Sequence, residues 1–121
     1  MNELKALAKK RAASGDYISI NELIKKYPDG VTVNGLFLKK TRGGEAVCFK
    51  FVEDPDKYFY ATGGDLKLTA EDWLDYCESL GEAKPVEITA SEMLEKEPVK
   101  LKIEKIRTKN GNTYTKVVNV D

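Results

Sequence analysis

The sequence predicts a mostly β domain with some helix, built on a five-stranded Greek-key barrel. Three alternating runs joined by short turns come first, a helical segment follows them, and a hairpin of two more strands closes the chain. Gly35 inside the first strand supplies the bend that a strongly coiled sheet needs. This is the strand order of the OB-fold, preceded here by two short N-terminal helices. An open α+β sheet with helices on one face is the alternative.

One domain is expected, because 121 residues are enough for one hydrophobic core and too few for two. It spans 1–121, with the N-terminal helices in 1–27 and the OB-like barrel in 30–121. Cys48 and Cys77 are the only cysteines and there is no histidine, so we expect two reduced thiols in or near the core and no zinc site. No apolar run approaches the roughly 20 residues of a membrane span, which favours a cytoplasmic protein without a membrane partner.

The two N-terminal helices are predicted from spacing and capping. Apolar residues recur at helical spacing over 2–13, and basic residues near the end of that stretch complement the helix dipole. Ser19 followed three residues later by Glu22 fits a capping box, which predicts a second helix over 20–26.

The strands and the later helices follow from alternation and turn residues. Thr69 to Asp72 opens a helix that runs to about Leu80, and a short helix is expected over 92–96. The predicted strands cover 31–40, 46–52, 57–62 and the two halves of a hairpin over 99–120.

The C-terminal hairpin has the strongest local signal in the chain. Asn110-Gly111 lies between two alternating runs and predicts a two-residue type I′ turn, since Asn and Gly adopt positive φ at little cost. Counting outward pairs Arg107 with Tyr114 and Lys105 with Lys116, so that these four side chains share one face. That face is apolar at its base and basic and aromatic toward its tip, as expected of a strand pair that projects toward a polyanion.

Charge is unevenly distributed although the net charge is zero. Residues 65–97 hold ten acidic and three basic side chains, and residues 98–121 hold six basic and two acidic ones. The folded protein should therefore be electrically two-sided. The acidic 65–97 face is interpreted as a surface that repels DNA or as a docking surface for a basic protein partner.

An OB-like barrel binds its ligand on strands two and three and on the loops at the end of that face. Two of those loops are basic here, at 39–44 and 107–112. Tyr58 and Tyr60 are the preferred stacking rings, because their hydroxyl groups tolerate water better than phenylalanine does. The predicted nucleic-acid-binding residues are Lys39, Lys40, Arg42, Lys50, Tyr58, Tyr60, Lys105, Arg107, Lys109, Tyr114 and Lys116.

Four segments carry a resemblance to a known group of proteins. They are Pro-Asp-Gly-Val-Thr-Val-Asn-Gly (28–35), Phe-Lys-Phe-Val-Glu-Asp (49–54), Lys-Tyr-Phe-Tyr-Ala-Thr-Gly-Gly (57–64) and Lys-Asn-Gly-Asn-Thr-Tyr-Thr (109–115). In these segments the chain resembles small proteins from the replication regions of phages and prophages of Gram-positive bacteria, which are similar to OB-fold single-stranded DNA-binding proteins. The resemblance implies DNA contacts at Lys39, Lys40, Arg42 and Arg107 with the strand aromatics.

Two functional classes remain after catalysis is considered. The chain has no histidine, no Gly-Lys-Ser/Thr phosphate motif and no carboxylate set with metal-ligand spacing, so we expect a non-enzymatic protein without a cofactor. The first class is a single-stranded DNA-binding protein of phage replication or recombination, with RNA as an alternative ligand. The second is a phage-type protein-interaction module that inhibits a host protein. The oligomeric state is left open.

Overall fold

The structure, a computed structural model, describes residues 3–4 and 16–119 of the chain. The predicted helix over 2–13 lies outside the described residues except for the helical Glu3-Leu4. The described elements are β1 (Asp16–Tyr17), α2 (Ile20–Lys26), β2 (Val31–Thr41), β3 (Gly44–Phe51), β4 (Lys57–Tyr60), α3 (Gly64–Ser79), α4 (Val86–Lys96), β5 (Val99–Arg107) and β6 (Thr113–Asn119).

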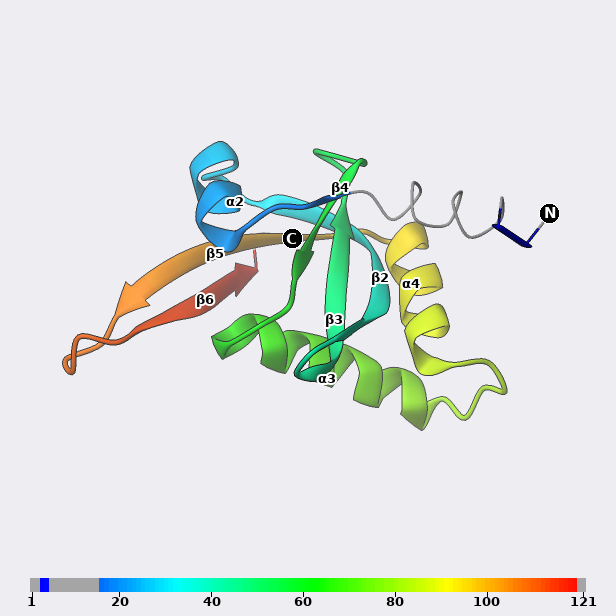
Figure 1. Cartoon of the computed structure of the whole chain (residues 1–121). Coiled ribbons are helices and arrows are strands. Elements are labelled where there is room, and N and C mark those ends of the chain that lie inside the picture. Colours follow the sequence, from blue (N-terminus) through cyan, green and yellow to red (C-terminus); the bar gives the residue numbers. More distant parts are fainter. Residues whose placement is uncertain (1–2, 5–15, 120–121) are drawn as a thin grey trace.

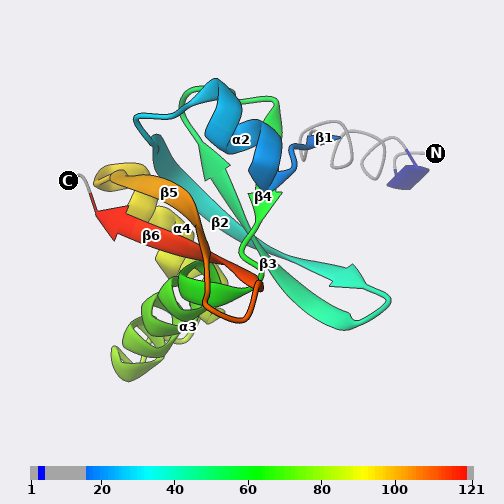
Figure 2. The same cartoon turned by 90° about the vertical axis from the view of Figure 1, so that its left-hand side faces the viewer.

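The strands form one six-stranded sheet in the order β1-β4-β3-β2-β5-β6. Within it, β2, β3 and β4 follow one another as antiparallel neighbours, and β5 returns over a long connection to lie beside β2, which is a Greek key. The sheet curls strongly, as Figures 1 and 2 show. Because β1 and β6 stand at its two edges, the described sheet is a curled half-barrel. This agrees broadly with the predicted barrel-like fold, but the sheet has six strands where five were predicted, and the helices are laid out differently.

The sixth strand is β1, which the sequence did not predict. It pairs in parallel with β4, and Asp16 and Tyr17 lie beside Lys57 and Tyr58. Two residues are too few to show an alternating pattern. The predicted second helix is confirmed. α2 covers 20–26 as predicted, and the Ser19 side chain accepts a hydrogen bond from the Glu22 N–H.

A bulge near Gly35 gives β2 its bend. The pairing with β3 shifts between Val33 and Gly35, so that β2 advances two residues while β3 advances one. The shift brings Leu36 onto the core face that Val33 occupies, and both are buried. The predicted bend at Gly35 is therefore confirmed.

Both later helices are longer than predicted and pack on one side of the sheet (Figure 2). The start of α3 is held against β6, where Asp65 Oδ2 accepts a hydrogen bond from the Val117 N–H at 3.1 Å. Gly64 has a φ of +53° and lies so close to the Thr115 backbone that a Cβ would collide with it. None of the described helices is long and apolar enough to cross a membrane.

The core lies between the concave side of the sheet and the helices. Phe49 is fully buried, and its ring centroid lies 5.6 Å from that of Phe59 and 5.3 Å from that of Trp73 on α3. Cys48 and Cys77 are both free and buried, in agreement with the predicted core thiols.

The C-terminal hairpin turns through three residues instead of the predicted two. The Gly111 N–H donates to the Thr108 carbonyl at 3.0 Å, the Thr108 N–H donates to the Asn112 carbonyl at 2.7 Å, and Gly111 has a φ of +80°. These bonds describe a turn followed by a left-handed glycine, the three-residue hairpin connection that competes with the type I′ turn.

The extra loop residue shifts the strand register by one. Arg107 stands opposite Thr113, and Tyr114 stands opposite Ile106. Because neighbouring residues along a strand point to opposite faces, Arg107 and Tyr114 lie on opposite faces of the hairpin. The predicted pairs Arg107 with Tyr114 and Lys105 with Lys116 were wrong.

Candidate nucleic-acid interface

The predicted binding residues fall into two separate groups. Six of them belong to the hairpin of β2 and β3 and to β4, and the others belong to the hairpin of β5 and β6. β2 pairs with β5 only between Val31–Val33 and Val99–Leu101, and from that short ladder the two hairpins run in different directions (Figures 1 and 2). The two basic loops therefore do not meet at one mouth, which corrects the predicted ligand face.

Lys39 is the centre of the first group, on the face of the sheet opposite the buried Phe49 and Phe59. Its Nζ donates a hydrogen bond to the Tyr58 hydroxyl and lies 5.0 Å from the Tyr58 ring centroid and 6.0 Å from that of Tyr60. The hydrogen bond to Tyr58 stabilises the charged ammonium group and raises the pKa of Lys39. This effect is larger than the opposing effect of desolvation, which lowers the pKa. Lys50 stands opposite Tyr58 in the ladder. We call Lys39, Lys50, Tyr58 and Tyr60 the outer-face cluster.

Tyr58 is not available as a stacking surface, contrary to the prediction. It is only 2% exposed, and the rings of Phe37 and Tyr60 lie 5.1 Å and 5.7 Å from its own. Tyr60 is half-buried, and its hydrogen bond with Tyr58 raises its pKa. Tyr17 is 60% exposed and lies 5.8 Å from Tyr60, so β1 adds a ring that the sequence analysis missed.

The thiol of Cys48 lies on the same side of the sheet and is fully buried. Burial raises its pKa from 9.0 to about 11, against the opposing charge of Lys39. The folded state therefore holds the thiol proton more tightly than the unfolded chain does. The resulting stability is fully present below pH 9 and is lost as the pH rises toward 11.

We expect this linkage to appear as a difference between the wild type and Cys48→Ala. The free energy of unfolding of the wild type should fall by about 2–3 kcal/mol more than that of the variant between pH 8 and pH 11. Urea unfolding with reductant present at several pH values measures it. All other ionisable side chains are the same in both proteins, so the difference isolates Cys48. Parallel pH profiles would contradict the buried thiol.

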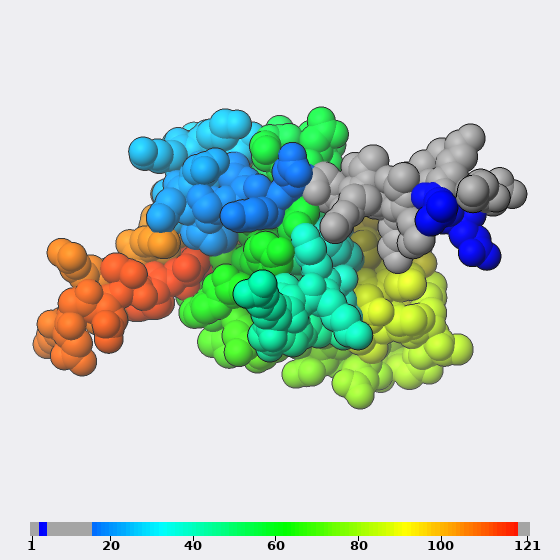
Figure 3. All heavy atoms as spheres, in the orientation of Figure 1, coloured from blue at the N-terminus to red at the C-terminus, as the bar shows by residue number. Residues whose placement is uncertain are grey.

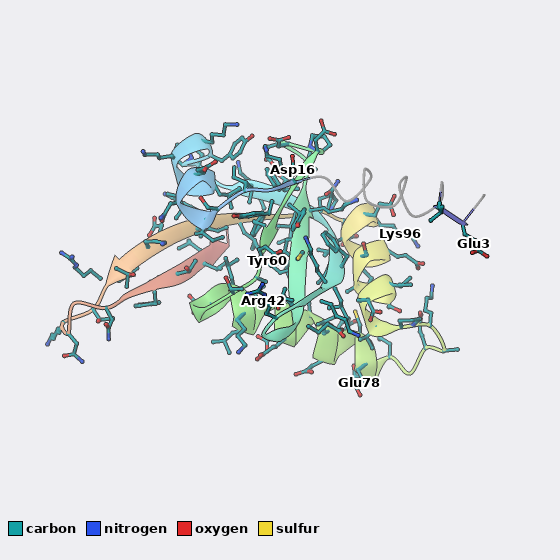
Figure 4. The ribbon with its side chains drawn as sticks, viewed as in Figure 1. Glu3, Asp16, Arg42, Tyr60, Glu78 and Lys96 are labelled. Atoms are coloured by element: carbon teal, nitrogen blue, oxygen red, sulfur yellow. The ribbon has the colours of Figure 1, made fainter. Side chains whose placement is uncertain are left out.

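The second group projects from the molecule on the hairpin of β5 and β6. We call residues 104–116 the arm; in Figures 1 and 3 it extends beyond the rest of the protein. Figure 4 shows Arg42 and Tyr60 over the body of the molecule, away from the arm. Within the described part of the chain, the only basic residue of β5 and β6 with a salt bridge is Lys102, which lies 3.5 Å from Glu104.

The arm carries cations on both faces and at its tip. Lys105 and Arg107 are exposed on one face, Lys116 is exposed on the other, and Lys109 lies in the turn. Tyr114 shares the Lys116 face and is 41% exposed. Glu104 is the only acidic residue of the arm. The arm can therefore contact a polyanion along its length.

Within the described residues, no group of three or more Cys, Asp or Glu side chains could hold a metal ion.

The chain is a mixed α/β protein whose curled Greek-key sheet extends into a cationic arm. Comparisons with protein-family models, with curated proteins and with solved structures found no match. The resemblance to phage single-stranded DNA-binding proteins therefore stays a prediction.

Proposed function

We propose that the protein binds single-stranded nucleic acid through the arm, without catalysing a reaction on it. The observation that supports this most strongly is the charge of the arm. Lys105, Arg107, Lys109 and Lys116 project from the body, and the described residues give none of them an ion-pair partner. Their positive charges stay available to neutralise phosphates.

The distribution of these cations favours a flexible ligand. Lys105 and Arg107 point to one face of a two-stranded ribbon, and Lys116 points to the other. A single strand can bend around the ribbon so that its phosphates reach both faces. Tyr114 offers an exposed ring on which one base can stack, an interaction that contributes about 1–3 kcal/mol.

The outer-face cluster takes a smaller part in this proposal than the sequence suggested. Tyr58 is sealed and its hydroxyl is already bound to Lys39. Lys40 is exposed near the end of β2, and Arg42 is exposed in the turn between β2 and β3. Figure 4 shows Arg42 away from the arm. We therefore assign the binding energy to the arm and none to Tyr58.

A titration of labelled oligo-dT at two salt concentrations tests the proposal. Neutralisation of four phosphates gives a slope of about −2.8 in log affinity against log salt. We expect the affinity to fall about 50-fold between 50 and 200 mM salt. The same titration with a duplex of equal length should give weaker binding.

The possible results separate the elements of the proposal. Tighter binding of the duplex would replace the single-strand assignment by insertion of the ribbon into a groove of the double helix. Binding that does not change with salt would rule out phosphate neutralisation. If neither probe bound at 50 mM salt, the proposal would be overturned.

A further inference from the structure

Two adjoining hollows along α3 form a groove on the side of the molecule that carries the helices. The first has a volume of about 180 Å³, lies between α3 and α4, and is lined by Trp73, Tyr76, Met93 and Leu94 among others. The second has a volume of about 590 Å³, lies between α3 and the base of β5 and β6, and includes Leu68 and Val117. Trp73 and Val99 line both, so the hollows are continuous.

The groove combines an apolar floor with an acidic rim. Its lining is mainly apolar, and large apolar side chains stay exposed beside it, with Leu68 at 56% and Tyr76 at 55%. Asp72 and Glu97 are exposed at its edge. Residues 65–97 hold ten acidic and three basic side chains, and one of the basic ones, Lys84, is already paired with Glu92 at 2.7 Å and with Glu82 at 3.8 Å. The groove therefore fits an apolar segment flanked by cations.

The arm of the same chain has that composition. Ile106 and Tyr114 stand opposite each other in the ladder and form an apolar rung near the tip. Lys116 lies on the same face as this rung and Lys109 follows it in the turn, whereas Lys105 and Arg107 point to the opposite face. An arm laid in the groove would place this rung on the floor and bring Lys116 and Lys109 to the acidic rim.

The arm cannot reach the groove of its own molecule. Its two strands are paired over seven successive positions, from Leu101 with Asn119 to Arg107 with Thr113, which keeps the ribbon extended. Its tip points away from α3 and α4, as Figures 1 and 3 show. The two complementary surfaces can therefore meet only between different molecules.

We propose that the arm of one copy docks into the α3–α4–β5 groove of a second copy. The two contacting surfaces are different, so the contact is heterologous and each added molecule again offers a free arm or a free groove. The assembly grows head to tail until it closes into a ring or continues as a chain. The proposal does not depend on nucleic-acid binding, although both use the cations of the arm.

Sedimentation velocity of the full chain at about 100 µM tests the assembly. We expect species larger than the monomer at 50 mM salt and a shift to monomer at 500 mM salt, because the ion pairs at the rim are screened. Two double variants should be monomeric in both buffers. The arm variant is Lys109→Glu with Lys116→Glu, and the groove variant is Asp72→Asn with Glu97→Gln.

Mixing the two variants gives the sharpest result. The groove variant keeps a native arm and the arm variant keeps a native groove, so an equimolar mixture should form a 1:1 dimer that grows no further. A control pair, Lys25→Glu with Lys26→Glu on α2, should assemble as the wild type does, because both lysines are exposed and lie outside the two surfaces.

Three results would overturn the proposal. The first is a wild type that stays monomeric at 50 mM salt. This result would overturn the proposal even if the groove bound a different protein. The second is assembly that persists in both double variants, and the third is a mixture that stays monomeric. Nucleic-acid binding is measured separately, and the groove variant should keep it, so the two proposals can fail independently.

Discussion

Lys105→Glu with Arg107→Glu is expected to weaken oligo-dT binding at least about 25-fold at 0.1 M salt. Each phosphate contact contributes a slope of about 0.7, which corresponds to about a fivefold gain in affinity for each tenfold drop of salt below 1 M. Removing two contacts loses both gains, and the new carboxylates repel phosphate in addition. Fluorescence anisotropy over several salt concentrations measures the affinity, and the slope should fall by about 1.4.

The control for this variant is Lys25→Glu with Lys26→Glu on α2. It changes the net charge by the same amount at two exposed lysines away from the arm. If general attraction by the whole protein drove binding, the two variants would lose equal affinity. An equal loss would therefore remove the arm as the binding surface. Circular dichroism of both variants should match the wild type, since all four side chains are exposed.

The sequence predicted local structure well where the signal was confined to a few neighbouring residues. Ser19 and Glu22 located α2, and Gly35 located the bend of β2. The Greek-key order of the last five strands also followed from the order of the alternating runs. Closure of the barrel did not follow, because it depends on whether two edge strands far apart in the chain meet, and no local pattern records that.

The candidate site was predicted less well for two physical reasons. One residue of loop length decided the register of the C-terminal hairpin, and this moved Arg107 to the face opposite Tyr114. Alternation alone also treats one face of a strand as open to solvent. Phe37 and Lys39 cover Tyr58 from β2, which lies two strands away from β4 in the sheet, so the ring is buried on the face that alternation predicts to be open to solvent.

Phe49→Ala is expected to lower the free energy of unfolding by about 3–5 kcal/mol, a large part of the 5–15 kcal/mol typical of a whole domain. The ring is fully buried and touches β4 through Phe59 and α3 through Trp73, so its removal leaves a cavity where three elements meet. Urea unfolding followed by tryptophan fluorescence measures the loss, since Trp73 is the only tryptophan. With a slope of about 2 kcal/mol per molar urea, the midpoint should fall by about 2 M.

Two further variants separate cavity formation from simple loss of an apolar side chain. Leu80→Ala truncates a residue that is 44% exposed at the end of α3 and should cost less than about 1 kcal/mol. Phe49→Leu keeps most of the buried volume and should fall between the two. If Phe49→Ala cost no more than Leu80→Ala, α3 would not pack on β3 through this ring. The concave face of the sheet would then lack the contact that holds α3, and with it the groove along that helix, in place.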